Sequence, residues 1–251
     1  MKSKKKENKK YYRLQLSPNF DEKRKRNIKY IIIHYTGVQS NKYSLEIFNN
    51  KESKVSCHWL ISKKGKIYKI VEEKNIAWHC GISNWKKITD LNRYSIGIEL
   101  DNPGHGINYK KFPLSQMNSL VFLLRKAINK YNINYKNILG HSDICPERKT
   151  DPGELFDWGF LAKKKLAFYP DLENKKKNSV VMYKLGDQNP ALLETKKLLN
   201  NIGYNCQLNN RFDLKFKSIV EAFQRRFFPQ EINGIITNNL YVRIKQISNN
   251  S

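Results

Sequence analysis

The segment Gly140–Gly153 holds a histidine and an aspartate whose spacing suits a metal site. His141 follows the short apolar run 137–140, and Asp151 comes ten positions later. The intervening loop is rich in proline and charge, so the two side chains cannot share one helix face. They meet only if the loop folds back, and a divalent metal is the group most able to hold them together there.

A third ligand is offered by His34, which closes the apolar run 28–33. Two imidazoles and one carboxylate form a typical catalytic zinc site, with one position open for water. Both imidazoles bind as neutral groups and the carboxylate subtracts one charge, so the ion keeps a net charge of about +1. Such an ion remains a strong Lewis acid, able to lower the pKa of bound water from 15.7 to about 7.

Glu99 is an acid inside the apolar segment 94–100, where a carboxylate needs a partner or a task. It could take a proton from the attacking water and later protonate a leaving amine. The structural alternative is a buried salt bridge.

Lys149 precedes Asp151 by two residues, which places both side chains on one side of an extended segment. Its ammonium would then face the metal and stabilise an oxyanion formed during amide hydrolysis. A solvated lysine is the alternative.

The other histidines have weaker claims. His58 lies in the segment 56–59 and His79 in the segment 77–81, and each is expected to form a pocket wall or to support a ligand. His105, next to two glycines, is expected in a loop.

Apolar periodicity predicts the elements that would position these residues. The helix 114–131 has the clearest stripe and begins next to Pro113. Strands and helices alternate irregularly, and the Gly65 region indicates a hairpin, so we expect an α/β (α+β) fold with a mixed sheet flanked by helices. The expected strands are 28–35, 56–62, 66–71, 94–101 and 135–139, and a second helix is expected at 43–51.

The C-terminal part, 180–251, is predicted to be a separate three-helix domain beyond a polar linker at 171–179. Gly203 is expected to end the first helix, and Asp213 and Thr237 to cap the second and third.

The chain has 251 residues and a formal net charge of +25. Residues 1–26 are expected to form a basic, mostly flexible arm. Such charge suits nucleic acid, an anionic membrane surface or an acidic polymer, but it is equally typical of a Lys- and Asn-rich composition. Nucleic-acid motifs, an apolar run of membrane-spanning length and an export signal are all missing from the sequence. The four cysteines lack metal or redox spacing, which leaves buried thiols or a Cys57–Cys80 disulfide open.

Five ordered motifs resemble the zinc-dependent N-acetylmuramoyl-L-alanine amidases, the family of T7 lysozyme, peptidoglycan recognition proteins and the AmpD and AmiD enzymes. The motifs read IIIHYT at 31–36, SCHW at 56–59, AWHCG at 77–81, SIGIE at 95–99, and GHSDI with KTDPG at 140–153. Residues 190–245 resemble, more weakly, the peptidoglycan-binding domain behind many such enzymes, with Arg211 where glycine is usual. The arrangement is closest to AmiD.

The resemblance implies an amidase domain at 27–170 that cleaves the amide between N-acetylmuramic acid, or its anhydro form, and L-alanine. It implies one Zn²⁺ per chain on His34, His141 and Asp151, with Glu99 and Lys149 as the catalytic pair. The implied substrate-binding residues are Tyr35, His58, Trp78, His79 and Arg148.

The implied partner is peptidoglycan or its muropeptide fragments, with no nucleic acid, and we expect a monomer. We expect action in the cell envelope, with the cytoplasm as the alternative. Removal of 180–251 is expected to spare cleavage of small muropeptides and to impair action on whole sacculi.

Three alternatives belong to other classes. A non-catalytic peptidoglycan-recognition protein would typically lack one metal ligand, whereas all three are present here. A non-haem iron oxygenase would use the same ligand types, but usually with one histidine and the acid close together on a strand. A nucleic-acid binder fits the charge alone.

Overall fold

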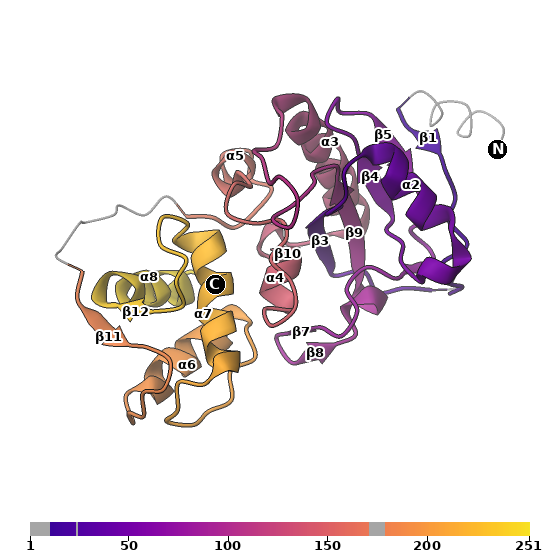
Figure 1. Ribbon diagram of the computed structural model, residues 1–251. Coiled ribbons are helices and arrows are strands. Elements are labelled where there is room, and N and C mark those ends of the chain that lie inside the picture. Colours follow the sequence, from indigo (N-terminus) through magenta and orange to yellow (C-terminus); the bar gives the residue numbers. More distant parts are fainter. Residues whose placement is uncertain (1–10, 24, 171–178) are drawn as a thin grey trace. The chain divides into compact units, whose positions relative to one another are not determined.

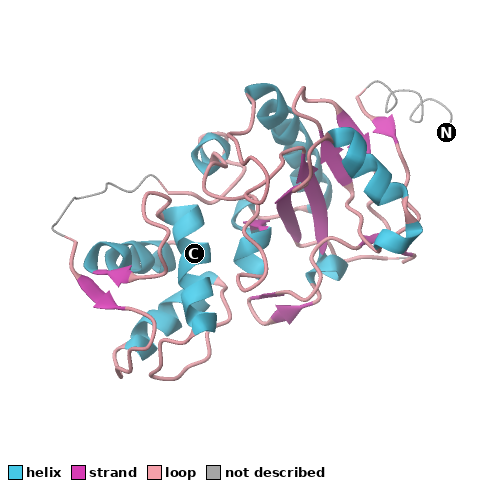
Figure 2. Cartoon of the chain, viewed as in Figure 1, coloured by secondary structure: helices cyan, strands magenta, loops and turns pink. Residues whose placement is uncertain are grey.

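The computed structural model describes residues 11–23, 25–170 and 179–251. Their contacts divide the chain into two compact units. One contains the described part of Met1–Gly81 together with Asp90–Leu139, and the other contains Ile82–Thr89 with the described part of Gly140–Ser251. Figures 1 and 2 trace the elements of both units.

The first unit is built on a six-stranded mixed sheet in the order β1-β5-β4-β9-β3-β10. Its centre is the parallel pair β3 (Tyr30–Tyr35) and β9 (Ser95–Leu100). β9 also pairs in parallel with β4 (Trp59–Ile61), and β4 pairs antiparallel with β5 (Ile67–Lys69) through the expected hairpin. β1 (Arg13–Leu14) and β10 (Ile138–Gly140) lie at the two edges.

Both central strands are buried along their whole length apart from the half-buried Tyr35, as their unbroken apolar runs predict. The mixed sheet confirms the expected fold class. The segment 135–139 differs in part, because Tyr135–Asn137 forms a short 3₁₀ helix before β10 begins. Asn134 caps that turn, which a reading of apolar residues alone passes over.

Two helices cover the faces of this sheet. α2 (Asn41–Asn49) places Phe48 in a cluster with Leu60 of β4. α3 (Leu114–Tyr131) lies on the face to which Trp59 points, because Phe122 of α3 and Trp59 line one pocket. α3 has the bounds predicted from its apolar stripe.

The described residues of the N-terminal segment differ from the flexible arm expected at 1–26. β1 pairs with β5, and β2 (Phe20–Asp21) pairs with β6 (Ile76–Ala77). Asn19 is 1% exposed, and its side-chain amide donates to the backbone carbonyls of Asn50 and Val55. These bonds fix a segment whose composition is typical of a solvated tail. Residues 1–10 and 24 lie outside the described part.

The second unit begins with the hairpin of β7 (Asn84–Trp85) and β8 (Ile88–Thr89). Its two-residue turn places Lys86 and Lys87 at positive φ. After β10 the chain forms α4 (His141–Ile144) and α5 (Trp158–Ala162). The loop expected after His141 therefore begins as a helical turn. It does so because the Asp143 carboxylate accepts the Gly140 N–H, which caps the turn.

The three C-terminal helices are α6 (Leu192–Ile202), α7 (Leu214–Phe227) and α8 (Asn238–Asn249). Their caps are those predicted, since Asp213 accepts from Phe216 N and Thr237 from Leu240 N. Gly203 ends α6 at φ 142°. Its missing side chain also leaves room for Trp85, whose ring would lie 2.3 Å from an added Cβ.

A short antiparallel pair, β11 (Val181–Tyr183) and β12 (Ile236–Thr237), ties the beginning of this region to the start of α8. The linker expected at 171–179 lies outside the described residues except for Ser179, so the domain division at that point stays a prediction. Within the described residues no helix has the length and apolarity needed to cross a membrane. All four cysteines are buried free thiols.

Candidate active site

His34 and Glu99 face the same side of the central sheet. They are direct register neighbours on the parallel strands β3 and β9, so their side chains project from the same face. His34 is 2% exposed and Glu99 9%. The apolar strands on which they lie hold both groups in place.

His141 and Asp151 are brought together by the backbone between them. Ser142 N donates to the carbonyl of Asp151, which turns the loop back onto α4. His141 Nδ1 then lies 3.1 Å from Asp151 Oδ2. An added Cβ at Gly140 would lie 2.7 Å from the ring of Pro152, so glycine permits this close return.

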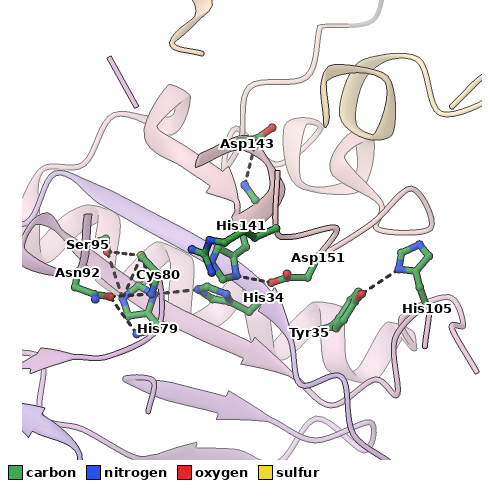
Figure 3. Close-up of polar contacts among 12 residues, drawn as sticks. His34, Tyr35, His79, Cys80, Asn92, Ser95, His105, His141, Asp143 and Asp151 are labelled. Atoms are coloured by element: carbon green, nitrogen blue, oxygen red, sulfur yellow. Dashed lines mark hydrogen bonds and ion pairs between the residues drawn. The ribbon is translucent and has the colours of Figure 1, made fainter. Parts of the chain in front are cut away.

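His34, His141 and Asp151 form a cluster of potential metal ligands. One ligand atom from each lies within 4.8 Å of the other two, and all three residues are buried. Figure 3 shows the three side chains converging. Two imidazole nitrogens and one carboxylate oxygen are the donor set that catalytic zinc prefers, so these residues fit that ion.

A fourth histidine contacts this cluster through His34. His34 Nε2 lies 3.0 Å from Nδ1 of His79, and the two rings meet edge to face. Histidines that bind a metal usually donate their second ring N–H to a neighbouring acceptor. His79 therefore stands where a supporting group is expected.

Comparison with known proteins gives the same assignment. The family described as N-acetylmuramoyl-L-alanine amidase matches residues 24–154. The N-acetylmuramoyl-L-alanine amidase AmiD of Escherichia coli is 33% identical over 222 residues, covering 82% of this chain and 77% of its own. The chain belongs to the N-acetylmuramoyl-L-alanine amidase family.

Two further relatives extend this result. The 1,6-anhydro-N-acetylmuramyl-L-alanine amidase AmpD of Haemophilus influenzae is 34% identical over 161 residues, covering 57% of this amidase and 85% of its own chain. The solved structure of E. coli AmiD with anhydro-N-acetylmuramic acid-L-Ala-D-gamma-Glu-L-Lys has a TM-score of 0.75 at 29% identity. It covers 92% of this amidase and 98% of the AmiD chain.

His58 differs from its expected place in the amidase's pocket. It is completely buried, its Nδ1 accepts from Gly97 N, and its Nε2 lies 3.2 Å from the carbonyl of Asn75. Burial, together with the nearby Arg26 cation, lowers the pKa of His58 to about 3. A neutral ring without exposed surface joins strands and cannot touch a substrate.

His79 is 7% exposed and packs against the backbone of β9, so its substrate contact stays a prediction. An added Cβ at Gly97 would lie 2.5 Å from its ring. The small residue in the SIGIE motif thus admits the imidazole.

The remaining expected contacts lie nearer the surface. Tyr35 is half-buried, and its hydroxyl lies 3.0 Å from His105 Nδ1, in the exposed loop predicted for that histidine. Trp78 is half-buried. Arg148 is exposed and donates to the carbonyl of Ile82 beside a pocket of about 380 Å³. All three can meet a ligand.

Lys149 is half-buried, and its backbone N–H donates to the carbonyl of Cys145. Burial raises the pKa of the Cys145 thiol above its ordinary value, although the nearby cations of Arg148 and Lys149 act to lower it. Lys149 thus closes a turn with Cys145, and the expectation that its ammonium faces the metal ligands stays a prediction.

Sequence reasoning missed two charged residues with many hydrogen bonds, the half-buried Arg26 and the buried Asp143. Arg26 donates to four backbone carbonyls, those of Glu73, Asn75, Asn92 and Ser95.

Asp143, two residues after His141, accepts from Arg226 at 2.6 Å and from Tyr204 at 3.0 Å. The only sequence signal for Asp143 was an acid inside the metal motif, and its partners lie 61 and 83 residues away.

Proposed function

We propose that this amidase hydrolyses the amide between muramic acid, or its 1,6-anhydro form, and the L-alanine of the stem peptide, in peptidoglycan turnover or recycling. The observation that carries the proposal is the buried cluster of His34, His141 and Asp151 inside the matched family region. It is supported by the AmiD structure solved with an anhydromuramyl peptide.

We assign one Zn²⁺ per chain to these three residues. When bound, zinc supplies Lewis acidity, which polarises the scissile carbonyl and acidifies water. The ligands keep their geometry because β3 and the bond between Ser142 and Asp151 fix their backbones. The low exposure of all three residues keeps bulk water away from the donor atoms.

Glu99 is assigned as the general base and acid. It lies on the strand next to His34, in register with it, and its burial limits solvation of the carboxylate. It would take the proton of the attacking water and return it to the departing L-alanine nitrogen. Lys149 is assigned to the oxyanion that forms on the carbonyl oxygen.

The half-buried or exposed residues are assigned to the substrate. Tyr35 and Trp78 would contact its sugar and lactyl portion, and Arg148 a carboxylate of the stem peptide. The net charge of +25 suits a polyanionic substrate. We place the site of action in the cell envelope and assign the region 180–251 to peptidoglycan binding.

Product analysis tests this function. Purified enzyme is incubated with a defined anhydromuropeptide, with and without chelator, and the products are weighed by mass spectrometry. We expect the intact stem peptide and free anhydromuramyl sugar, and no cleavage with chelator. Cleavage inside the stem peptide or between sugars would refute the proposal.

A further inference from the structure

A chain of hydrogen bonds leads from His34 away from the metal-ligand cluster into the core. His34 Nε2 lies 3.0 Å from His79 Nδ1, and His79 Nε2 lies 3.3 Å from Ser95 Oγ. Ser95 Oγ in turn donates to the carbonyl of Leu91 at 2.6 Å. Figure 3 shows His34, His79 and Ser95 in this succession.

The far end of this hydrogen-bond chain indicates which nitrogen of each imidazole ring carries the hydrogen. A backbone carbonyl only accepts, so the single hydroxyl hydrogen of Ser95 is used on Leu91. Ser95 Oγ can then only accept from His79, whose Nε2 must carry its hydrogen. A neutral imidazole has one N–H, so Nδ1 of His79 is an acceptor, and it takes the Nε2–H of His34.

This hydrogen placement determines the state of Nδ1, the other ring nitrogen of His34. With the hydrogen held on Nε2, a neutral His34 carries its ring lone pair on Nδ1. A metal ligand must present such a lone pair, and a second-sphere acceptor normally selects the tautomer. The hydrogen-bond chain therefore prepares His34 to bind a cation through Nδ1.

The position of the His79 ring is also fixed by contacts outside this chain of hydrogen bonds. The backbone N–H groups of His79 and Cys80 both donate to Oδ1 of Asn92, at 3.0 and 2.8 Å. The ring lies against Gly97, and Cys80 Sγ lies 3.2 Å from its Nδ1. These contacts hold the ring against β9, with Nδ1 beside both Cys80 and His34.

We propose that His79 is a positioning residue, which holds His34 in the Nε2–H tautomer so that Nδ1 binds the catalytic metal, with Ser95 and the Leu91 carbonyl as its anchor. The proposal rests on the zinc site of the proposed function. It replaces the substrate-contact role expected for His79.

The tautomer itself is measured on metal-free protein by long-range ¹H–¹⁵N correlation of the imidazole rings. The chain has only five histidines, so assignment by single substitution is practical. We expect His34 and His79 to show Nε2–H and an unprotonated Nδ1. His58 is an internal reference, because its Nδ1 accepts from Gly97 N and requires the same tautomer. An Nδ1–H tautomer at His34 would overturn the proposal.

Zinc affinity, measured by competition with a chromophoric chelator, gives the second readout. His79→Leu removes the acceptor and should weaken zinc binding about 10- to 100-fold. His79→Asn, whose side-chain oxygen can replace Nδ1, should recover most of that loss. Ser95→Ala should weaken binding less than His79→Leu, because it removes only the anchor. The control, His105→Leu in the exposed loop, should bind zinc as the wild type does.

Wild-type zinc affinity in His79→Leu would overturn the proposal, as would equal losses in His79→Leu and His79→Asn variants whose thermal unfolding matches the wild type. A wild-type chain that binds no zinc would contradict the proposed function instead. The tautomer measurement on metal-free protein would still test the hydrogen-bond chain independently of that result.

Discussion

At the scale of single residues, the proposed catalytic residues and the residues that support them differ in their contacts and not in their burial. Glu99 and His34 share one face of two paired strands, whereas His58 is enclosed and His79 contacts both the ligand His34 and Ser95 of β9. Four of the five histidines are buried, so residue type alone cannot rank them. Their partners do.

Replacing Glu99 by Gln tests its role as proton carrier. The amide keeps the shape of the carboxylate but cannot accept a proton, so kcat should fall about 100-fold or more while zinc content stays at one per chain. Turnover of a muropeptide and metal analysis measure the two effects. A fully active Glu99→Gln enzyme would contradict the acid–base assignment.

The depressed pKa of His58 predicts a loss of stability in acid. Its pKa is about 3 in the folded chain, chiefly through burial, and about 6.5 when unfolded. Between these two pH values His58 is protonated in the unfolded chain and neutral in the folded chain. The free energy of unfolding therefore decreases as the pH falls below about 6.5. From pH 6.5 to 4.5 this contributes about 2 kcal/mol.

Urea unfolding at those two pH values measures the effect. His58→Asn, which can still accept from Gly97, should show a shallower pH dependence than the wild type. Equal slopes would show that His58 titrates normally in the folded chain.

At the scale of elements, much of the framework was predictable. The helix 114–131 and the caps Gly203, Asp213 and Thr237 were assigned correctly, because stripes and caps are local in sequence. β1 and β2 were missed, since two-residue strands carry no periodicity and Leu14 is 53% exposed. The bond between His34 and His79 spans 45 residues, and no spacing rule reveals it.

Arg26 connects the N-terminal segment to the central elements. Its guanidinium donates to four carbonyls and lies 3.0 Å from His58 Nε2, and burial lowers its pKa to about 10. Lysine has a single donor group and cannot span these acceptors. Arg26→Lys should therefore lower the free energy of unfolding by about 2–4 kcal/mol.

Denaturant unfolding measures this loss, with Arg125→Lys on the exposed face of α3 as the matched control. The control should change stability by less than about 0.5 kcal/mol. Similar values for the two variants would show that the hydrogen bonds of Arg26 to the four carbonyls are unimportant for stability.

At the scale of the whole molecule, the C-terminal helix α7 contacts the segment that carries His141. Arg226 of α7 pairs with Asp143 of α4, with side-chain exposures of 4% and 1%, and Tyr204 donates to the same carboxylate. Asp143 lies two residues after His141. Removing one partner of a buried pair typically costs about 3–5 kcal/mol. The expectation that loss of 180–251 spares small muropeptides is therefore replaced by one of lost stability and weakened zinc binding.

Arg226→Met isolates this contact without truncation. It should destabilise the chain by about 3 kcal/mol and weaken zinc binding, because Asp143 would lose its cation and keep, among the described residues, the neutral donors Gly140 N–H and Tyr204 hydroxyl. Arg225→Met, beside it on α7 and 3.7 Å from Glu221, is the control and should have a small effect. Equal behaviour of the two variants in thermal unfolding would contradict a structural role for α7.

The most direct test is a zinc titration of metal-free enzyme, followed by the rate of stem-peptide release from an anhydromuropeptide. We predict that activity rises linearly and stops at one equivalent of zinc per chain, and that His34→Ala and Asp151→Ala remain inactive throughout. Full activity without metal, or in either ligand variant, would contradict the assignment of catalysis to a zinc ion held by His34, His141 and Asp151.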